Sequence, residues 1–327
     1  MSTVKDAEGG PVRPERRIAE LDALRGFALC GIIFINIPQT LEMFDDAGQL
    51  PGVLRVFFFG RFYPIFFLLF GIGFGLFLRS ARRNGLRPRV LLLRRFAALG
   101  FVGVLLHLLQ PGEVLLPFAV TGVLVLLPLS YVEGWAVLAH GSVLTAAGVF
   151  VGAGGIALLP GLFALGFVLA ELDVPATLRR RTGQLLALGA GAAVTGALAW
   201  WLTVLDLPDA ARLRLGMLIP LSMAAGYMVL FLLALRTPAG PALSRTLAPL
   251  GRMTLTNYVT AALLFVPIGG ALGLRHSTEW GLAALLGFGI LAVQAVFSHL
   301  WLGTFRHGPL EWAWRCVTYW RRLPISR

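Results

Sequence analysis

Long apolar runs separated by short polar gaps repeat along almost the whole chain. Each run has roughly 17–25 residues, which as a helix is enough to cross a hydrocarbon core of about 30 Å. The fifth and sixth runs are separated only by a glycine-rich stretch at 152–155, so nine spans remain an alternative. The pattern predicts an all-α polytopic integral membrane protein of about ten transmembrane helices, at residues 26–44, 62–78, 93–110, 114–132, 135–153, 156–172, 183–204, 215–235, 253–273 and 280–304.

Composition and charge placement support this class. The 327 residues are 57% hydrophobic and 13% charged, more apolar than a soluble domain can bury. The net charge of +12 comes mainly from arginines in the gaps between apolar runs, so it indicates membrane orientation rather than a nucleic-acid partner. With ten spans and both termini in the cytoplasm, most of the 28 basic residues fall on the cytoplasmic side. The five on the outer side are Arg55, Arg61, Arg212, Arg214 and Arg275. The predicted domains are therefore a cytoplasmic N-terminal segment (1–25), a transmembrane domain (26–304) and a basic, Trp-rich cytoplasmic tail (305–327).

Targeting and metal signals are weak. The polar N-terminus is followed by no small-residue cleavage site, so a removed signal peptide is not expected. The two cysteines, Cys30 and Cys316, lie in a predicted span and in the tail, which predicts neither a disulfide nor a metal site.

Two segments outside the spans are predicted to lie at the membrane surface. The outer loop 45–61 is long enough for a short interfacial helix. The tail alternates tryptophan with arginine, which is typical of an anchor on anionic lipid headgroups.

Polar side chains within the apolar runs are the candidate functional residues, because each ionisable group in a bilayer is costly. Asp22 and Arg25 share a helix face and can neutralise one another, either as a site or as a simple snorkelling pair. Asn36 lies three turns further on and could equally join helices by a hydrogen bond. Predicted near the same outer depth are Arg61, His107 and Glu113, whereas Arg94, Arg95, Arg252, Asn257, His299 and Arg306 lie toward the inner side.

Five stretches resemble, in order, the signature segments of the YeiB family of bacterial membrane proteins, also known as domain of unknown function 418. They are "RIAELDALRGFALCGIIFINI", "GRFYPIFFLLFGIGFGLFL", "LHLLQPGEVLLPFAV", "APLGRMTLTNYV" and "FSHLWLGTFRHGPLEWAWRCVTYWRR". The resemblance covers about residues 17–132 and 245–322. It implies a bacterial plasma membrane location and a distant relationship with the acyltransferase-three proteins and heparan-alpha-glucosaminide N-acetyltransferase, which carry acyl groups from cytoplasmic acyl-CoA to a hydroxyl or amine at the far face.

The resemblance also suggests roles for single residues. The acyltransferase-three pattern places a catalytic histidine eleven residues after the arginine that corresponds to Arg25, but this chain has Asn36 there. We therefore expect His107 to serve as the general base, oriented by Glu113, with Asn36 and Arg61 as oxyanion donors. The expected ligands of the CoA phosphates are Arg25, Arg94, Arg95 and Arg252. Further polar candidates are Asp22, Asn257, His299, Arg306 and Glu311.

Three functions remain open from the sequence. The first is a membrane acyltransferase that uses acyl-CoA as co-substrate, needs no metal and delivers to a small-molecule, glycan or lipid acceptor. The second is a transporter or flippase, whose path the same polar groups would line. The third is a non-catalytic accessory protein. The acceptor, the acyl chain and the oligomeric state are not determined by the sequence.

Overall fold

The computed structural model describes residues 18–132, 134–152 and 154–326, and within these ranges the regular elements are helices. The expectations for residues 1–17 therefore lie outside the described residues. Seven described helices are long and apolar enough to cross a membrane: α1 (Ala19–Thr40), a segment Leu54–Arg83 that ends in α2 (Tyr63–Arg83), α3 (Pro88–His107), α9 (Thr182–Thr203), α10 (Asp209–Ala234), α12 (Thr254–Ala271) and α13 (Trp280–Thr304).

Three shorter apolar helical segments account for the remaining predicted spans. They are Leu115–Leu129, which contains α4 (Leu115–Thr121), η3 (Gly122–Leu126) and α5 (Leu127–Leu129); α6 (Trp135–Val151); and Gly155–Glu171, which contains η4 (Gly155–Leu158) and α7 (Leu159–Glu171). Gly152 has a left-handed backbone and ends α6, so the disputed fifth and sixth runs form two helices. Every predicted span thus coincides with an apolar helix. The number that cross the membrane and the side of the termini stay predictions.

The remaining elements are short. The outer loop holds only η1 (Ala47–Gln49) and η2 (Leu54–Phe58) rather than one continuous interfacial helix. Further along the chain, α8 (Val174–Thr177) and η5 (Leu178–Arg180) follow α7. Two amphipathic helices, α11 (Gly240–Arg252) and α14 (Pro309–Tyr319), flank the last two long helices.

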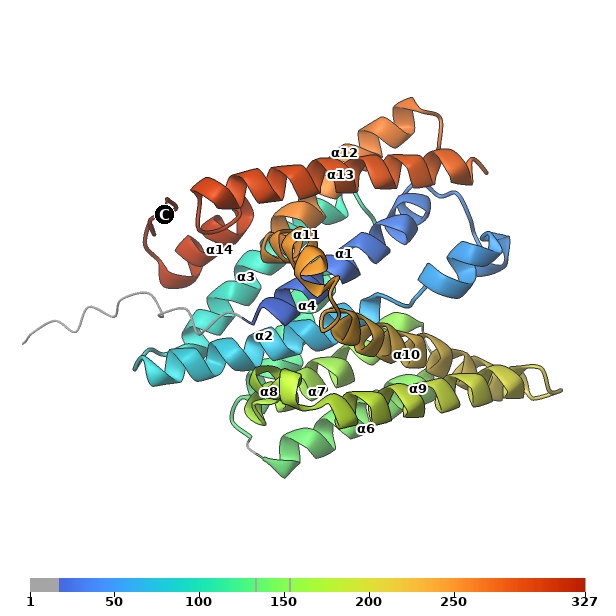
Figure 1. Ribbon diagram of the computed structural model, residues 1–327, viewed down its shortest axis with the longest axis horizontal. Coiled ribbons are helices and arrows are strands. Elements are labelled where there is room, and N and C mark those ends of the chain that lie inside the picture. The colour runs from blue at the N-terminus through green and yellow to red at the C-terminus, as the bar shows by residue number, and fades with distance from the viewer. Residues whose placement is uncertain (1–17, 133, 153, 327) are drawn as a thin grey trace, which may run out of the picture.

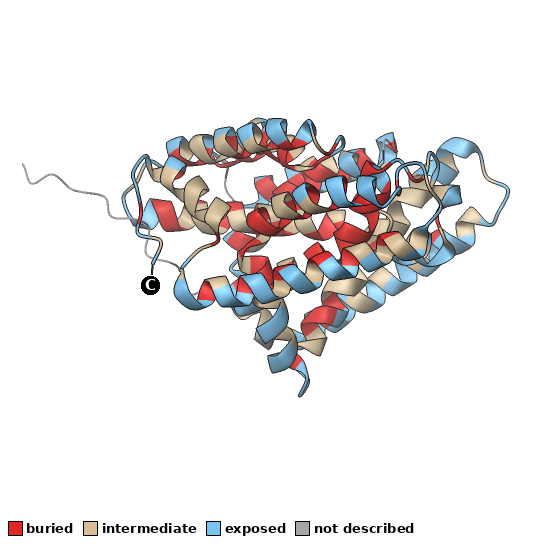
Figure 2. Ribbon diagram, turned by 90° about the horizontal axis from the view of Figure 1, so that it is seen from above, coloured by how far each residue is buried: buried red, intermediate tan, exposed pale blue. Residues whose placement is uncertain are grey.

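Helix α1 lies at the centre of the molecule (Figure 1). It packs against α2, α11, α12 and α13. In its most apolar 18-residue stretch, 78% is buried inside the protein, compared with 11% in the corresponding stretch of α9. Figure 2 shows the buried residues gathered on the middle helices and the exposed ones on the outer helices. The exposed outer surfaces are strongly apolar, with Trp200, Trp201, Leu285 and Phe288 among the exposed side chains, as expected of helices that face lipid.

Helices α1 and α11 touch backbone to backbone. A β-carbon on Gly26 would collide with the carbonyl oxygen of Leu247, and one on Gly251 would collide with that of Asp22. Small residues permit such close approach of helices in membranes. This contact brings Arg252, the last residue of α11, to the same end of the molecule as Arg25.

Substitution of Gly26 by alanine is expected to destabilise the fold by about 1–3 kcal/mol, because the new methyl group must push α11 away from α1. The measurement is thermal unfolding of the full chain in lipid nanodiscs. Gly191→Ala in α9 is the control, because nothing lies within 4 Å of its β-carbon position. Equal unfolding temperatures for the two variants would contradict this account of the α1–α11 contact.

Candidate functional site

Two adjoining cavities lie between the helices. The first, here called the mouth, has a volume of about 850 Å³. The second, here called the inner chamber, has a volume of about 440 Å³. The residues that line both cavities define the neck between them: Arg25, Leu76, Phe77, Gly251, Arg252 and Arg315.

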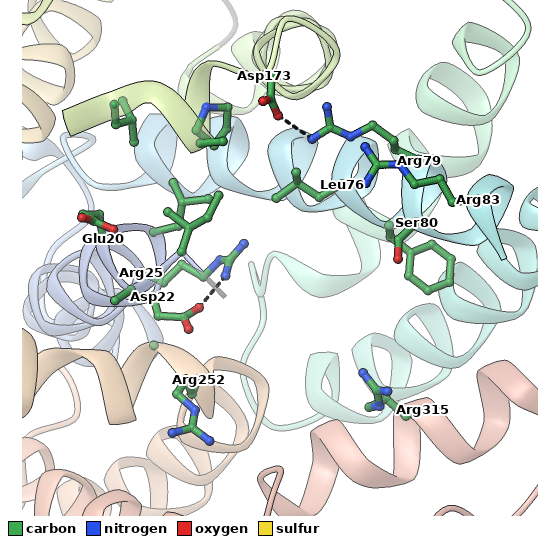
Figure 3. A pocket seen from close by; sticks show the side chains of 18 of the residues that line it. Glu20, Asp22, Arg25, Leu76, Arg79, Ser80, Arg83, Asp173, Arg252 and Arg315 are labelled. Carbon is green, nitrogen blue, oxygen red and sulfur yellow. Dashed lines mark hydrogen bonds and ion pairs between the residues drawn. The ribbon is translucent and has the colours of Figure 1, made fainter. Parts of the chain in front are cut away.

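The mouth is strongly basic. Its lining contains six arginines and three carboxylates, so positive charge dominates. The arginines come from the start of α1, the end of α2, the segment after α7, the end of α11 and α14: Arg25, Arg79, Arg83, Arg180, Arg252 and Arg315. Figure 3 shows several of these side chains arranged around the cavity. All belong to segments that the charge distribution predicts to be cytoplasmic.

Two ion pairs hold arginine side chains of the mouth in place. The Nη1 atom of Arg25 lies 3.0 Å from the Oδ1 atom of Asp22, and this pair is partly buried. The Nη2 atom of Arg79 lies 2.9 Å from the Oδ1 atom of Asp173, whose side chain is 54% exposed (Figure 3). The first pair confirms the sequence-based expectation that Asp22 and Arg25 neutralise one another, and it directs Arg25 toward the neck.

The inner chamber is mainly apolar and is built from one face of each of several helices. On α2 the lining residues recur with helical spacing: Phe66, Leu69, Phe70, Gly73, Phe74, Leu76 and Phe77. The opposite walls are supplied by Leu92, Phe96 and Leu99 of α3 and by Leu115 and Phe118 of α4. Tyr258 of α12 also lines the chamber, and its hydroxyl accepts a hydrogen bond of 3.3 Å from the backbone N–H of Val114.

Helix α14 closes the inner chamber on the side of the tail. Glu311, Trp314 and Arg315 are spaced three and four residues apart, and all three line the chamber. The indole N–H of Trp314 donates to the carbonyl oxygen of Arg95 at 2.8 Å, and the Arg95 guanidinium lies 3.9 Å from the centre of the Trp314 ring. The predicted tail is therefore packed onto the transmembrane helices, and part of it forms cavity wall. Its proposed contact with anionic lipid remains a prediction.

Glu311 is held by the first turn of α12. Its carboxylate accepts hydrogen bonds from the backbone N–H groups of Leu255 at 2.7 Å and Thr256 at 3.0 Å, and from the Thr256 hydroxyl at 2.6 Å. Burial raises the pKa of Glu311, while the hydrogen bonds from Thr256 and Leu255 oppose this rise. Glu311 is the one carboxylate among the described residues that line the inner chamber.

The structure does not bring His107 into either cavity. It is the last residue of α3 and is exposed, and no hydrogen bond or ion pair to Glu113 is found within the described part of the chain. Glu113 instead accepts hydrogen bonds from the backbone N–H groups of Leu115 and Leu116 and so caps α4. Neither side chain lines the mouth or the inner chamber, and the expected pairing of His107 with Glu113 as a general base stays a prediction.

The expected oxyanion donors also have structural roles. The Arg61 guanidinium donates to the carbonyl oxygens of Val56 and Phe59 and so holds the outer loop. Asn36 is buried and accepts a hydrogen bond of 3.0 Å from the Tyr63 hydroxyl. It borders a small void of about 10 Å³ next to Tyr258, outside the inner chamber.

The other candidates divide between the cavities and the surrounding structure. Of the expected phosphate ligands, Arg25, Arg95 and Arg252 line a cavity, whereas Arg94 lies against the Trp320 ring. Asn257 is fully buried and bonds to Ser298 of α13, so it joins two helices. His299 and Arg306 are exposed and line neither cavity. No group of three or more metal-binding side chains occurs in the described ranges.

Sequence reasoning missed most of the inner chamber. Phe66, Phe70, Phe74 and Phe77 recur every three to four residues, so their common helix face is visible in the sequence. Aromatic residues at this spacing more often belong to a packed core than to a cavity wall. The roles of Arg79, Arg83 and Arg315 in the mouth depend on how distant helix ends meet, which no local pattern indicates.

The fold and the cavity define a multi-pass helical membrane protein with a basic opening that leads to an apolar chamber. The comparisons with known proteins agree with this class. The chain belongs to the YeiB family: residues 167–321 match the family described as protein of unknown function (DUF418). Residues 17–183 match the catalytic domain of heparan-alpha-glucosaminide N-acetyltransferase, so the chain is related to that group.

Three bacterial relatives support the family assignment. An "uncharacterized 39.9 kDa protein in amylase 3'region" of Bacillus acidopullulyticus is 32% identical, covering 96% of this chain and 97% of the relative. YxaH of Bacillus subtilis is 39% identical over 25% of this chain and 21% of its own length. YeiB of Escherichia coli is 38% identical over 24% of this chain and 22% of its own length. No solved structure is significantly similar.

Proposed function

We propose that this protein is a membrane-bound acyltransferase that takes an acyl group from cytoplasmic acyl-CoA and transfers it to the hydroxyl or amine of an acceptor that reaches the neck. The observation that carries the proposal is the basic mouth that leads through a neck into an apolar chamber. The match of residues 17–183 to an acetyltransferase catalytic domain supports it, because that segment supplies four helices, α1 to α4, that line the inner chamber.

The mouth offers the chemistry that the nucleotide end of CoA needs. Its phosphates would meet Arg25, Arg252 and Arg315, whose planar guanidinium groups can each give two parallel hydrogen bonds to phosphate oxygens. Because these three arginines also line the neck, they would hold the end of the pantetheine arm, with its thioester, at the entrance to the inner chamber.

The reaction would take place at the neck. The acceptor oxygen or nitrogen attacks the thioester carbon, the carbon–sulfur bond breaks and the CoA thiolate leaves. The Glu311 carboxylate would accept the acceptor's proton and pass it to the thiolate, and burial, which raises the pKa of this carboxyl, makes it a stronger proton acceptor. Arg25 or Arg252 would stabilise the negative charge that develops on the carbonyl oxygen.

The proposal is tested with the full chain in proteoliposomes and acyl-CoA labelled in the acyl group. Movement of label from CoA to extracted lipid or glycan supports acyl transfer. Protein that binds CoA and yet leaves all the label on it, with bacterial membrane lipids and glycans supplied as acceptors, would contradict acyl transfer. Failure to bind CoA at all would remove the proposal altogether.

A transporter of an amphiphilic solute is the second candidate. The observation that favours it is the lack of a histidine among the described residues lining the two cavities. The same proteoliposomes distinguish the two functions, because transport predicts net flux of an amphiphilic solute without any change in the label's covalent attachment.

His107→Ala is expected to retain CoA binding and acyl transfer within about two-fold of the unmodified protein, because His107 is exposed and lines neither cavity. Turnover and CoA affinity in nanodiscs are the measurements. Loss of turnover with intact CoA binding would restore the role that the sequence alone suggests for this histidine.

A further inference from the structure

The inner chamber has walls that are fixed by aromatic packing. The rings of Phe70 and Phe163 stack with centroids 4.7 Å apart, and Phe118 meets Phe70 edge-on at 5.1 Å. Phe74 and Phe96 stack at 6.1 Å. Such ring contacts stabilise one arrangement, so the chamber is preformed.

The charged groups of the inner chamber lie on one side. Arg25, Arg252 and Arg315 belong to the neck, Glu311 belongs to α14, and the Arg95 guanidinium covers the Trp314 ring of α14. The walls formed by α2, α3 and α4 are otherwise phenylalanine, leucine, valine and glycine. Two polar residues of α12, Thr254 and Tyr258, also line the chamber. The Thr254 hydroxyl already donates to the carbonyl oxygen of Gly251, and the Tyr258 hydroxyl already accepts from the backbone N–H of Val114.

This distribution determines what can occupy the chamber. A polar arm with amide groups would lose its hydrogen bonds to water among these side chains and gain few in return, which is unfavourable. A hydrocarbon chain has no such groups, and each buried methylene increases affinity by up to about four-fold.

We propose that the inner chamber binds the hydrocarbon chain of the acyl donor, so that the protein uses acyl groups of several carbons in preference to acetyl. This inference rests on the proposed function: the nucleotide and its arm occupy the mouth, the thioester lies at the neck, and the chain extends between α2, α3 and α4.

Gly73 provides a way to block the chamber. It lies on the lining face of α2, and a β-carbon there would meet the Arg25 Nη2 atom at 3.5 Å, an ordinary contact distance. A leucine at this position would extend into the space that the acyl chain needs. Gly191 of α9, whose β-carbon position has nothing within 4 Å, is the matched site for a control leucine.

The experiment measures affinities of CoA, acetyl-CoA, butyryl-CoA and octanoyl-CoA for the full chain in nanodiscs, with empty nanodiscs to subtract partition into lipid. We expect octanoyl-CoA to bind at least ten-fold more tightly than acetyl-CoA. Gly73→Leu should abolish this preference and still bind CoA, whereas Gly191→Leu should keep the preference.

The outcomes separate this inference from the proposed function. Equal affinity for all acyl lengths, with CoA bound, overturns the chain-binding inference alone. No binding of any CoA compound overturns both. The series in the unmodified protein decides the inference even if Gly73→Leu does not fold. A length preference that is unchanged in a folded Gly73→Leu protein would show that the chain lies elsewhere.

Discussion

Replacement of Arg252 by alanine is expected to weaken CoA binding by about 10- to 150-fold, because one charge-assisted hydrogen bond to phosphate contributes about 1.5–3 kcal/mol. Arg25→Ala should act similarly, since both arginines line the mouth and the neck. The measurement is CoA affinity of the full chain in nanodiscs, repeated at higher salt, where the difference between variant and unmodified protein should decrease.

Arg245→Ala is the matched control for this prediction. Arg245 is on the same helix as Arg252, but it is exposed and lines neither cavity, so CoA affinity should not change. Arg25→Lys keeps the positive charge but loses the planar guanidinium group that can give two parallel hydrogen bonds to a phosphate. We therefore expect its CoA affinity to lie between those of the unmodified protein and Arg25→Ala. Equal CoA affinity in the unmodified protein, Arg252→Ala and Arg245→Ala would place the nucleotide outside the mouth.

Substitution of Glu311 is expected to have the largest effect on stability. Glu311→Ala leaves the N–H groups of Leu255 and Thr256 at the start of α12 without their carboxylate acceptor and opens the contact between α12 and α14. We expect a loss of about 2–4 kcal/mol, because buried donors that lose a charged partner are costly. Thermal unfolding in nanodiscs measures this loss.

Glu311→Gln distinguishes the chemical role from the structural one. It keeps the shape and one acceptor oxygen, so the protein should fold and bind CoA, while turnover should fall about 100-fold or more if the carboxylate accepts a proton. A variant with normal turnover and normal CoA binding would assign Glu311 to structure only.

The pH dependence follows from the raised pKa of Glu311. Because burial raises this pKa above its ordinary value of 4.5, the folded protein holds the proton more tightly than the unfolded chain. The stability associated with the protonated form is therefore fully present below the unfolded pKa and is lost as pH rises through the folded pKa. Unfolding temperatures should decline less over this pH range in Glu311→Gln than in the unmodified protein.

The amino-acid sequence was sufficient to predict the class of protein and the position of every apolar helix. The helix pattern depends on run length and hydrophobicity, which are local properties, and even the disputed pair of helices at Trp135–Val151 and Gly155–Glu171 is separated where the glycine-rich stretch predicts. The pairing of Asp22 with Arg25 was also predictable, because residues three apart share a helix face.

Depth in the membrane did not predict which polar side chains line the two cavities. His107, Glu113, Asn36 and Arg61 are predicted at one level, but the folded helices turn His107 outward and bind the other three side chains to separate partners. The rotation of a helix about its axis is set by its neighbours, and the sequence alone does not specify those neighbours.

The sequence by itself therefore determined an all-helical membrane protein of the YeiB type, with arginines concentrated toward one side. Only the tertiary structure decided that the ends of α1, α2, α11 and α14 meet around a basic mouth, and that Glu311 from the tail closes an apolar chamber behind it. The physical reason is that hydrophobicity places a residue along the membrane normal, whereas a cavity forms from side-chain packing between helices that are distant in sequence.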